Sequence, residues 1–501
     1  ILAKTVKGFG MGAAGEGQNI AHQQKKLDIE ALKVFRDRFN IPVADKDLDQ
    51  VPYCLPPKDS PELEYLQERR QSLGGYLPAR RARSTSLTVP PLEVFKTQLD
   101  GSGEREISTT MAFVRMLTAL TRDKQIGKNI VPIVPDEART FGMEGMFRQI
   151  GIYASEGQLY TPQDADQLMY YREDKKGQIL EEGINEAGAF CSWVAAGTSY
   201  SNHDTPMIPF YIYYSMFGFQ RIGDFIWAGG DMQSRGFLMG GTAGRTTLAG
   251  EGLQHQDGHS LVHASTVPNC RAYDPTYAYE LAVIIQDGLR RMMGEQENVF
   301  YYIACMNENY VHPPMPAGVE DGILRGLYLL QVGGQGQIRP QLMGSGTILR
   351  EVLGAAEMLN DDFGIPSDVW SVTSFNELRR DALEVERWNQ LHPEDTPRKC
   401  YIEETLAGRK GPYIAATDYM KIVPDQIQRW VPGRFISLGT DGYGRSDGRA
   451  ALRNHFEVDR RYIVVTTLQA LADDGALDSK TVTDAIEKYG IDPNKPDPVT
   501  L

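Results

Sequence analysis

Short apolar runs alternate with segments of helical periodicity along most of this chain. Runs of the buried-strand type lie at residues 129–135, 206–218, 270–273, 298–303, 341–343 and 368–372. Helical patterns lie between them, at residues 111–120, 184–196, 219–227, 275–293 and 347–359. Such alternation is typical of α/β proteins with parallel sheets flanked by helices, which is the fold class we expect. A proline cluster at 313–316 marks a boundary, so we expect one domain at 86–315 and a smaller α/β domain at 316–501.

The first 85 residues follow a different pattern. Residues 1–7 have strand character, residues 8–17 are too rich in glycine for regular structure, and residues 27–39 predict a helix. A stretch rich in proline and charge extends to residue 106, with short helices at 61–73 and 91–99, and is typical of a linker that wraps a surface. His22 lies on or beside the glycine-rich loop. A lone histidine is more often a surface or packing residue, but a mobile loop keeps a catalytic alternative open.

One charge interrupts the apolar segment at 184–196. Glu186 is the only charged residue there, and its neighbours are small or apolar, so we expect a buried helix. Because an isolated charge in a dry site is unfavourable, Glu186 must either find a strong partner or hold its proton, as acid catalysts do. The alternative is a structural glutamate that caps a neighbouring backbone or pairs with an arginine.

Two further acidic residues follow a predicted strand. Asp136 and Glu137 come directly after the strand at 129–135, and ligands of open α/β sheets bind at the carboxyl ends of strands. The alternative is that Asp136 caps the next helix. Residues 150–172 are polar and rich in turn residues, which suggests a lid over a site.

A segment rich in glycine and histidine occupies residues 240–263. No lysine follows its glycines, so it does not match a phosphate-binding loop. His255, His259 and His263 are spaced by four, but Gly258 and the many turn residues disfavour a continuous helix and a zinc site. A binding loop that presents one or two histidines fits the pattern better.

Composition narrows the class of protein. The chain has 501 residues and a formal net charge of −14, which disfavours nonspecific nucleic-acid binding. The five cysteines contain no Cys-x-x-Cys pair, which argues for a reducing compartment, the cytoplasm, and against structural zinc. We see no membrane span and no secretory signal. The chain begins inside a predicted strand without an initiator methionine, so we expect it to be a fragment that lacks an upstream part.

Several long strings together carry a family resemblance. They are Lys4-Thr-Val-Lys-Gly-Phe-Gly-Met-Gly, Asn19-Ile-Ala-His-Gln, Asp136-Glu-Ala-Arg-Thr-Phe-Gly-Met-Glu-Gly, Arg245-Thr-Thr-Leu-Ala-Gly-Glu-Gly-Leu-Gln-His and Gly439-Thr-Asp-Gly-Tyr-Gly-Arg-Ser-Asp. With them the whole chain resembles the homodimeric bacterial pyruvate dehydrogenases (acetyl-transferring), which use thiamine diphosphate. The resemblance implies a transketolase-like, thiamine diphosphate-binding fold. Residues 1–85 would end the diphosphate-binding domain, 86–315 would bind the pyrimidine, and 316–501 would be a transketolase-type carboxy-terminal domain.

The same resemblance implies roles for single residues. Glu186 matches the glutamate that protonates the aminopyrimidine of the cofactor, Phe217 matches the residue that stacks on this ring, and Ile184 contacts the ring. His22 resembles the loop histidine needed for reductive acetylation of the lipoyl group. His255 resembles the histidine that faces substrate and cofactor. The other residues that the resemblance places in the pocket are Tyr214, Asp136, Glu137 and Lys7.

For a whole enzyme the resemblance implies oxidative decarboxylation of pyruvate and acetylation of the lipoyl domain of dihydrolipoyl acetyltransferase, whose core would be a partner. The active site would lie between the subunits of a homodimer. Gly-Asp-Gly, which in thiamine enzymes helps to hold Mg²⁺ and diphosphate, is absent from this chain, so we expect those ligands upstream. Two alternatives stay open: a non-catalytic binding module, or another thiamine enzyme such as a transketolase. A transketolase would need a cluster of cations for its sugar phosphate, and the pocket strings show none.

Overall fold

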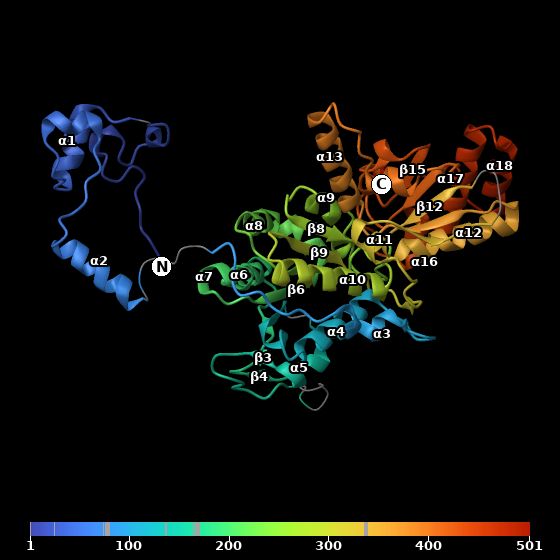
Figure 1. The fold of residues 1–501 in the computed structure, drawn as a ribbon, viewed down its shortest axis with the longest axis horizontal. Coiled ribbons are helices and arrows are strands. Elements are labelled where there is room, and N and C mark those ends of the chain that lie inside the picture. The colour runs from blue at the N-terminus through green and yellow to red at the C-terminus, as the bar shows by residue number, and fades with distance from the viewer. Residues whose placement is uncertain are drawn as a thin grey trace. The chain divides into compact units, whose positions relative to one another are not determined.

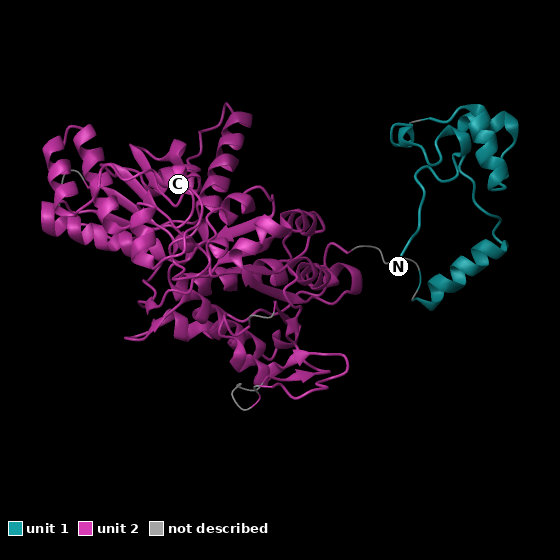
Figure 2. Ribbon diagram, turned by 180° about the vertical axis from the view of Figure 1, so that it is seen from behind, with its two compact units in different colours: residues 1–79 teal, residues 80–501 magenta. Residues whose placement is uncertain are grey.

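The structure is a computed structural model that describes residues 2–24, 26–73, 75, 81–135, 138–163, 165, 171–334 and 339–501. The chain forms two compact units, residues 1–79 and residues 80–501 (Figure 2). Unit 1 contains the α-helices α1 (Ile29–Arg38) and α2 (Pro61–Ser72) and the short 3-10 helices η1 (Gly12–Ala14), η2 (Asn19–His22) and η3 (Asp45–Gln50).

In unit 1 a carboxylate organises the glycine-rich loop. Glu16 Oε2 accepts hydrogen bonds from the backbone nitrogens of Gly10 and Gly12 at 3.1 and 3.2 Å, and it pairs with Arg38 at 2.5 Å. Gly10 has a φ of 92°, which only glycine adopts readily, so this loop has the unusual backbone that its composition predicts. The strand predicted at residues 1–7 is wrong: residues 2–6 have no regular structure. The described part of unit 1 has no strand with which they could pair.

A six-stranded, all-parallel sheet forms the first half of unit 2 (Figure 1). Its strand order is β5-β2-β6-β7-β9-β8. The strands are β2 (Ile130–Val134), β5 (Leu180–Glu181), β6 (Ile208–Tyr214), β7 (Phe237–Gly241), β8 (Cys270–Tyr273) and β9 (Phe300–Ala304). All the longer strands predicted in this half are therefore confirmed.

A five-stranded sheet forms the second half, in the order β11-β13-β12-β14-β15. Its strands are β11 (Tyr328–Gln331), β12 (Gln341–Gly344), β13 (Asp368–Ser371), β14 (Tyr413–Ala416) and β15 (Phe435–Leu438). Only β11 runs antiparallel, against β13. Two small ribbons complete the strands, β1 (Glu106–Ile107) with β10 (Tyr310–Val311) and β3 (Ile152–Tyr153) with β4 (Glu173–Asp174).

Helices cover both faces of these sheets (Figure 1). Ser108 begins the helix predicted at 111–120, because its side chain accepts a hydrogen bond from Met111 N. The α-helices of unit 2 are α3 (Lys96–Leu99), α4 (Thr109–Thr121), α5 (Glu144–Ile150), α6 (Glu186–Gly197), α7 (Ser199–His203), α8 (Phe219–Asp231), α9 (Ser260–Ala264), α10 (Ala278–Leu289), α11 (Glu320–Arg325), α12 (Leu349–Phe363), α13 (Phe375–Leu391), α14 (Tyr401–Thr405), α15 (Ile422–Asp425), α16 (Arg449–His455), α17 (Arg460–Asp473) and α18 (Ser479–Lys488).

Alternating residues of the central strands enter two different cores. Phe210 and Ile212 of β6 belong to the core that includes residues of α4, α10, α12 and α17, whereas Tyr211 and Tyr213 belong to the core that includes residues of α6, α8 and α13. This is the two-sided burial expected of a parallel sheet covered by helices. Both cores extend through both sheets, so packing alone does not separate residues 86–315 from 316–501, and that boundary stays a prediction.

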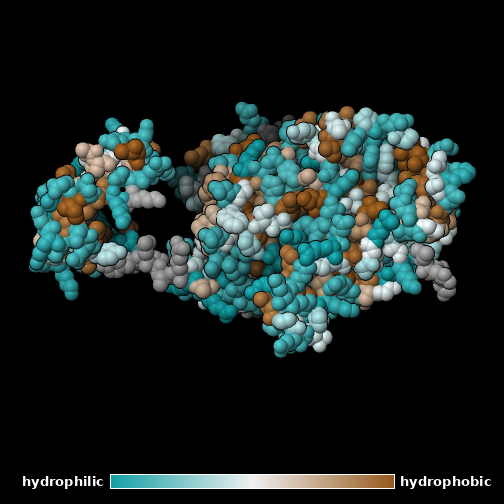
Figure 3. Space-filling view, turned by 90° about the horizontal axis from the view of Figure 1, so that it is seen from above, coloured by the Kyte–Doolittle hydropathy of each residue, from teal (hydrophilic) through white to brown (hydrophobic). Residues whose placement is uncertain are grey.

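The surface of the protein is mixed in character. On the face shown in Figure 3, hydrophobic residues lie in scattered groups among hydrophilic ones. Single exposed apolar side chains are ordinary on protein surfaces. Of the described helices, none has both the length and the apolar character needed to cross a membrane.

Candidate functional site

Three segments singled out in the sequence lie where neighbouring parallel strands end. The chain leaves β5 and enters α6 at Glu186, leaves β6 and enters the 3-10 helix η6 (Ser215–Phe217), and leaves β7 to form the loop that contains His255. Because β5, β2, β6 and β7 are neighbours and parallel, their carboxyl ends share one edge of the sheet. This edge is where α/β proteins of this kind bind ligands.

Glu186 is the first residue of α6 and is nearly buried. Asn185 caps the helix by accepting a hydrogen bond from Gly188 N at 3.1 Å. The Glu186 side chain is 9% exposed, and Arg221 Nη1 donates a hydrogen bond to its Oε1 at 2.8 Å. Glu186 therefore has the arginine partner that the sequence left as an alternative. Since the Arg221 side chain is 50% exposed, water still reaches this ion pair.

The surroundings of Glu186 are less buried than the apolar sequence suggests. Ile184 is 68% exposed and Cys191 is also exposed, so the expectation of a fully buried segment is wrong. Only one face of α6, with Ala189, Phe190 and Trp193, packs into the core. The other face carries small residues, which a helix tolerates at its surface. The prediction from apolar composition therefore overestimated how much of this segment is buried.

Aromatic residues surround the ion pair. Arg221 Cζ lies 4.2 Å from the centroid of the Phe217 ring. The ring of His255 lies 5.3 Å from that of Phe217 and 4.9 Å from that of Tyr214. Tyr214 also contacts Phe141, at 5.6 Å. The structure thus brings Glu186, Phe217, Tyr214 and His255 into one connected cluster.

A buried aspartate ties the histidine loop to the aromatic turn. Ser215 Oγ donates to Asp257 Oδ2 at 2.5 Å, and the backbone nitrogens of His259 and Ser260 donate to Asp257 Oδ1 at 3.0 Å each. The Asp257 side chain is completely buried. Through these bonds Asp257 fixes the loop that carries His255 against the turn that carries Phe217.

His255 presents an unsatisfied nitrogen to this cluster. Its Nδ1 is buried and has no hydrogen-bond partner among the described residues. A buried polar atom without a partner is unfavourable, so a ligand atom at this position would satisfy it. His255 ends the 3-10 helix η7 (Leu253–His255), which is separate from α9. The three histidines therefore do not share one helix, which confirms the prediction made from Gly258 and the turn residues. Burial lowers the pKa of His259.

Asp418, which follows β14, holds the start of the histidine loop. Its Oδ1 accepts hydrogen bonds from Thr246 N and Oγ1 at 2.9 and 2.7 Å, and its Oδ2 accepts from Thr247 N and Oγ1 at 3.1 and 2.6 Å. Gly244 has a φ of 85°, and a Cβ at this position would overlap Asp418 Oδ2, so only glycine fits there. Burial raises the pKa of Asp418, and the four hydrogen bonds oppose this effect.

Two strings that carry the family resemblance meet at this loop. The Arg245 guanidinium donates to the carbonyl of Thr440, 195 residues away, and Arg445 N donates to Gln256 Oε1 at 2.6 Å. The segment 439–447 therefore packs on the segment 245–256. It follows that the second sheet domain positions the histidine loop of the first.

The cluster has the features that an aminopyrimidine ring needs. Such a ring stacks on an aromatic side chain, and a carboxylate hydrogen-bonds to its ring nitrogen. Phe217 is half-buried, Glu186 supplies the carboxylate, and His255 Nδ1 lacks a partner. The residues present thus fit the pyrimidine half of thiamine diphosphate. Among the described residues no group of three or more His, Cys, Asp and Glu side chains is arranged to hold a metal ion.

The structure does not place every predicted site residue in the cluster. Asp136 and Glu137 lie outside the described residues. Lys7 and His22 are exposed residues of unit 1, and their roles stay a prediction. Part of the expected lid at 150–172 also lies outside the described residues, and the role of that segment stays a prediction.

Sequence reasoning missed the residues that connect the cluster. Arg221 follows Phe217 by four positions, and a search for a cation to pair with Glu186 could have selected it. Asp257 lies inside the histidine loop, where its neighbouring turn residues offered a weak signal. Asp418 contacts Thr246 across 172 positions, and nothing local in the sequence indicates this pair.

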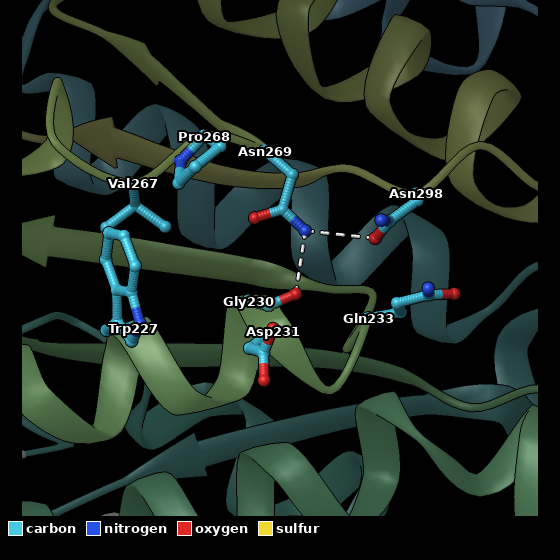
Figure 4. Close-up of a pocket in the computed structure, with 8 residues that line it drawn as sticks. All are labelled: Trp227, Gly230, Asp231, Gln233, Val267, Pro268, Asn269 and Asn298. Atoms are coloured by element: carbon cyan, nitrogen blue, oxygen red, sulfur yellow. Dashed lines mark hydrogen bonds between the residues drawn. The ribbon is translucent and has the colours of Figure 1, made fainter.

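A separate pocket of about 240 Å³ lies outside this cluster (Figure 4). Asn269 Nδ2 donates to Gly230 O and to Asn298 Oδ1, both at 2.9 Å, so its amide group is engaged within the protein. The lining residues are Trp227, Gly230, Asp231, Gln233, Val267, Pro268, Asn269 and Asn298. None of them was predicted as a site residue.

Comparison with protein families gives two matches. Residues 87–313 match the family "Pyruvate dehydrogenase E1 component middle domain", and residues 326–459 match the family "Transketolase-like TK C-terminal domain". The chain is 64% identical over 501 residues to the pyruvate dehydrogenase E1 component of Pseudomonas aeruginosa, covering 100% of this chain and 57% of that protein. It is 57% identical over 503 residues to that of Escherichia coli, covering 99% and 56%. The chain thus spans just over half the length of the curated relatives it matches.

Solved structures show the same fold at low sequence identity. Transketolase from Campylobacter jejuni aligns with a TM-score of 0.60 and 15% identity, covering 94% of this chain and 63% of that one. Transketolase from Leishmania mexicana aligns with a TM-score of 0.54 and 14% identity, covering 91% and 56%. The expected transketolase-like α/β fold is confirmed.

Proposed function

Because this chain belongs to the family of bacterial pyruvate dehydrogenase E1 components, of which it spans just over half, we propose that it contributes the pyrimidine half of a thiamine diphosphate site. The whole enzyme would carry out oxidative decarboxylation of pyruvate and reductive acetylation of the lipoyl group of dihydrolipoyl acetyltransferase, in the cytoplasm. The observation that carries this proposal is the cluster of Glu186, Phe217 and His255 at the carboxyl ends of three parallel strands.

Each residue of the cluster has a distinct task in this proposal. Thiamine diphosphate, when bound, supplies the nucleophile and the electron sink that decarboxylation of a 2-keto acid requires. Glu186, whose side chain is 9% exposed, shares a proton with the ring nitrogen. Phe217 stacks on the ring, while His255 donates or accepts a proton next to the substrate. Tyr214, Ile184, Asp136 and Glu137 complete the pocket wall.

The remaining parts of the reaction depend on groups that the cluster does not contain. We place the Mg²⁺ and diphosphate ligands outside these 501 residues, since no metal-binding group occurs among those described and the relatives are longer. Lys7 and His22 would act in the whole enzyme, where His22 would supply a proton when the lipoyl disulfide opens. A homodimer and the acyltransferase core complete the assembly.

Titration calorimetry of thiamine diphosphate with MgCl₂ tests this proposal. We expect strong binding by a chain extended to the length of the relatives and weak or no binding by the 501 residues alone. In the extended chain, Phe217→Ala should weaken binding about tenfold, since an aromatic stacking contact contributes roughly 0.5–1.5 kcal/mol beyond its buried area. Phe225→Ala, in the neighbouring helix α8, is the matched control, because Phe225 is 43% exposed and lies outside the cluster.

Three outcomes would contradict parts of this proposal. Absence of binding by the extended chain would contradict the thiamine assignment. Tight binding by the 501 residues would mean that the diphosphate and metal ligands lie within them. Binding without decarboxylation of pyruvate, with turnover of a sugar phosphate instead, would favour a transketolase, and binding of the acyltransferase core alone would favour a binding module.

A further inference from the structure

A cavity of about 790 Å³ lies in the second half of unit 2, among α12, α16 and α17. Its size is within the range of small-molecule sites. Four of its described lining residues are arginines, against two carboxylates, and the neighbouring Glu308 pairs with Arg453 and lies 3.8 Å from Arg449 Nε. This local excess of positive charge is notable in a chain whose net charge is −14. The lining residues are Glu351, Met358, Arg449, Ala450, Arg453, Asp459, Arg460, Arg461 and Tyr489.

The two carboxylates orient the arginines and are themselves fully engaged. Glu351 Oε2 accepts hydrogen bonds from Arg460 N at 3.1 Å and from Arg460 Nε at 2.9 Å, and Arg453 Nη1 lies 3.4 Å from its Oε1. Burial alone would raise the pKa of Glu351, but these arginines lower it below its ordinary value. Asp459 caps α17 by accepting from Arg461 N at 2.9 Å, and it also binds the Arg461 guanidinium.

Two of the arginines keep unused donors at the cavity. Arg449 donates from Nε to Thr247 O at 2.6 Å, and among the described residues its terminal nitrogens have no hydrogen-bond acceptor. Arg460 uses Nε and Nη2 on Glu351, and its Nη1 likewise has no acceptor in the described part of the chain. Their side chains are 32% and 46% exposed, so both are accessible from solvent.

The backbone of α12 makes room for one of these groups. A Cβ added at Gly354 would lie 2.8 Å from Arg460 Cζ and 2.8 Å from its Nη1, which is closer than real Cβ atoms approach. Glycine at this position in a helix is otherwise unfavourable by about 1 kcal/mol relative to alanine. Gly354 therefore lets the Arg460 guanidinium lie directly against the helix, with its position set from one side by Gly354 and from the other by Glu351.

We propose that this cavity binds a phosphate-bearing small molecule through the unused nitrogens of Arg449 and Arg460. Guanidinium groups recognise phosphate oxygens with paired hydrogen bonds, and two of them can hold one phosphate or two linked phosphates. Arg453 and Arg461 line the same space, but they are paired with Glu308, Glu351 and Asp459, so the free donors are those of Arg449 and Arg460. Arg449 also contacts Thr247, which Asp418 holds at the start of the histidine loop. A bound anion would thus contact a residue that supports the loop carrying His255.

Titration calorimetry with inorganic pyrophosphate, in chloride buffer of constant ionic strength, tests the proposal on the 501-residue chain. We expect saturable binding that Arg449→Gln and Arg460→Gln each weaken at least tenfold. Arg449→Lys keeps the charge but loses the paired donors, so it should weaken binding less than Arg449→Gln. Arg429→Gln is the matched control: Arg429 is 64% exposed, pairs with Glu386 and lies outside the cavity, so its loss should leave the affinity unchanged.

Gly354→Ala gives a test that removes no charge. It displaces the Arg460 guanidinium and should also weaken pyrophosphate binding, while the thermal midpoint shows that the variant folds. No saturable heat with the unmodified chain would overturn the proposal. Equal affinity in the arginine variants and in Arg429→Gln would also overturn it, since the anion would then bind elsewhere. Thiamine diphosphate is absent from this experiment, so its outcome is separate from that of the proposed function.

Discussion

Arg221 donates a hydrogen bond to Glu186 at 2.8 Å while its guanidinium covers the ring of Phe217 at 4.2 Å. One side chain therefore contacts both residues that we assign to the pyrimidine ring. A ring that stacks on the covered face of Phe217 would displace this guanidinium. Arg221 thus competes with such a ring for this face of Phe217, and its pair with Glu186 is the first relationship to measure.

A double-mutant cycle with Glu186→Gln and Arg221→Gln should give a coupling free energy of about 0.5–1 kcal/mol in the free energy of unfolding. The value is modest because water reaches the half-exposed Arg221 side chain. Urea unfolding of the four proteins measures it. The exposed pair of Arg429 and Glu386 is the control cycle and should give a smaller value. No coupling between Glu186 and Arg221 would show that the ion pair does not form in solution.

Asp418→Asn should destabilise the protein by about 1–3 kcal/mol and loosen the histidine loop. The amide places an N–H group where the carboxylate accepts hydrogen bonds, so a buried donor of Thr246 or Thr247 loses its acceptor. Urea unfolding measures the stability, and hydrogen exchange of residues 242–259 measures the loosening. Asp425→Asn is the control, because Asp425 is an exposed carboxylate that accepts one hydrogen bond, from Ser437. Unchanged exchange in Asp418→Asn would contradict the role of the second sheet domain in holding this loop.

Asp274 should make the protein less stable as the pH rises from about 4 to 7. Burial and the nearby carboxylates of Asp418, Glu280 and Asp257 raise the pKa of Asp274 to about 7, from an ordinary value of 3.8. In this window the folded chain holds a proton that the unfolded chain releases, so rising pH favours unfolding, by at most about 4 kcal/mol. Asp274→Asn should flatten this part of the stability profile. Urea unfolding at pH 5 and pH 8 measures the effect, with the exposed Asp204→Asn as the unaffected control.

His312 should make the protein less stable as the pH falls, whereas Asp274 makes it less stable as the pH rises. Burial lowers its pKa to about 4, from 6.5. Its Nδ1 accepts a hydrogen bond from Ala278 N at 2.9 Å, so the neutral ring carries its proton on Nε2, 2.9 Å from Ile107 O. Between pH 6.5 and 4 the unfolded chain binds a proton at His312 that the folded chain does not bind. The free energy of unfolding therefore decreases as the pH falls, by at most about 3 kcal/mol.

His312→Gln separates this effect from that of Asp274. The variant should be less stable at pH 7, because it loses the stacking of the imidazole ring on Tyr310 at 4.6 Å, but it should lose less further stability between pH 6.5 and 4 than the unmodified chain does. The exposed His203→Gln is the matched control. An acid dependence in His312→Gln equal to that of the unmodified chain would contradict the assignment.

The local pattern of residues was sufficient for most secondary structure. The apolar runs at 341–343 and 368–372 became β12 and β13, and the helical pattern at 111–120 became α4. These features depend on interactions between near neighbours in the chain, so the sequence contains the needed information. The strand predicted at residues 1–7 failed because a strand forms only against a partner, which the local pattern cannot supply.

The sequence by itself determined which residues stand out as candidates, and the tertiary structure decided what they contact. Glu186 stood out as a charge in an apolar segment, but its exposure and its pairing with Arg221 follow from the packing of α6 beside α8. His255 stood out in a histidine-rich loop, but Asp418, more than 150 positions further along the chain, holds that loop in place. The physical reason is that such pairs form only when distant segments are brought together. The order of the strands and the shape of the core decide that arrangement, and no local periodicity records it.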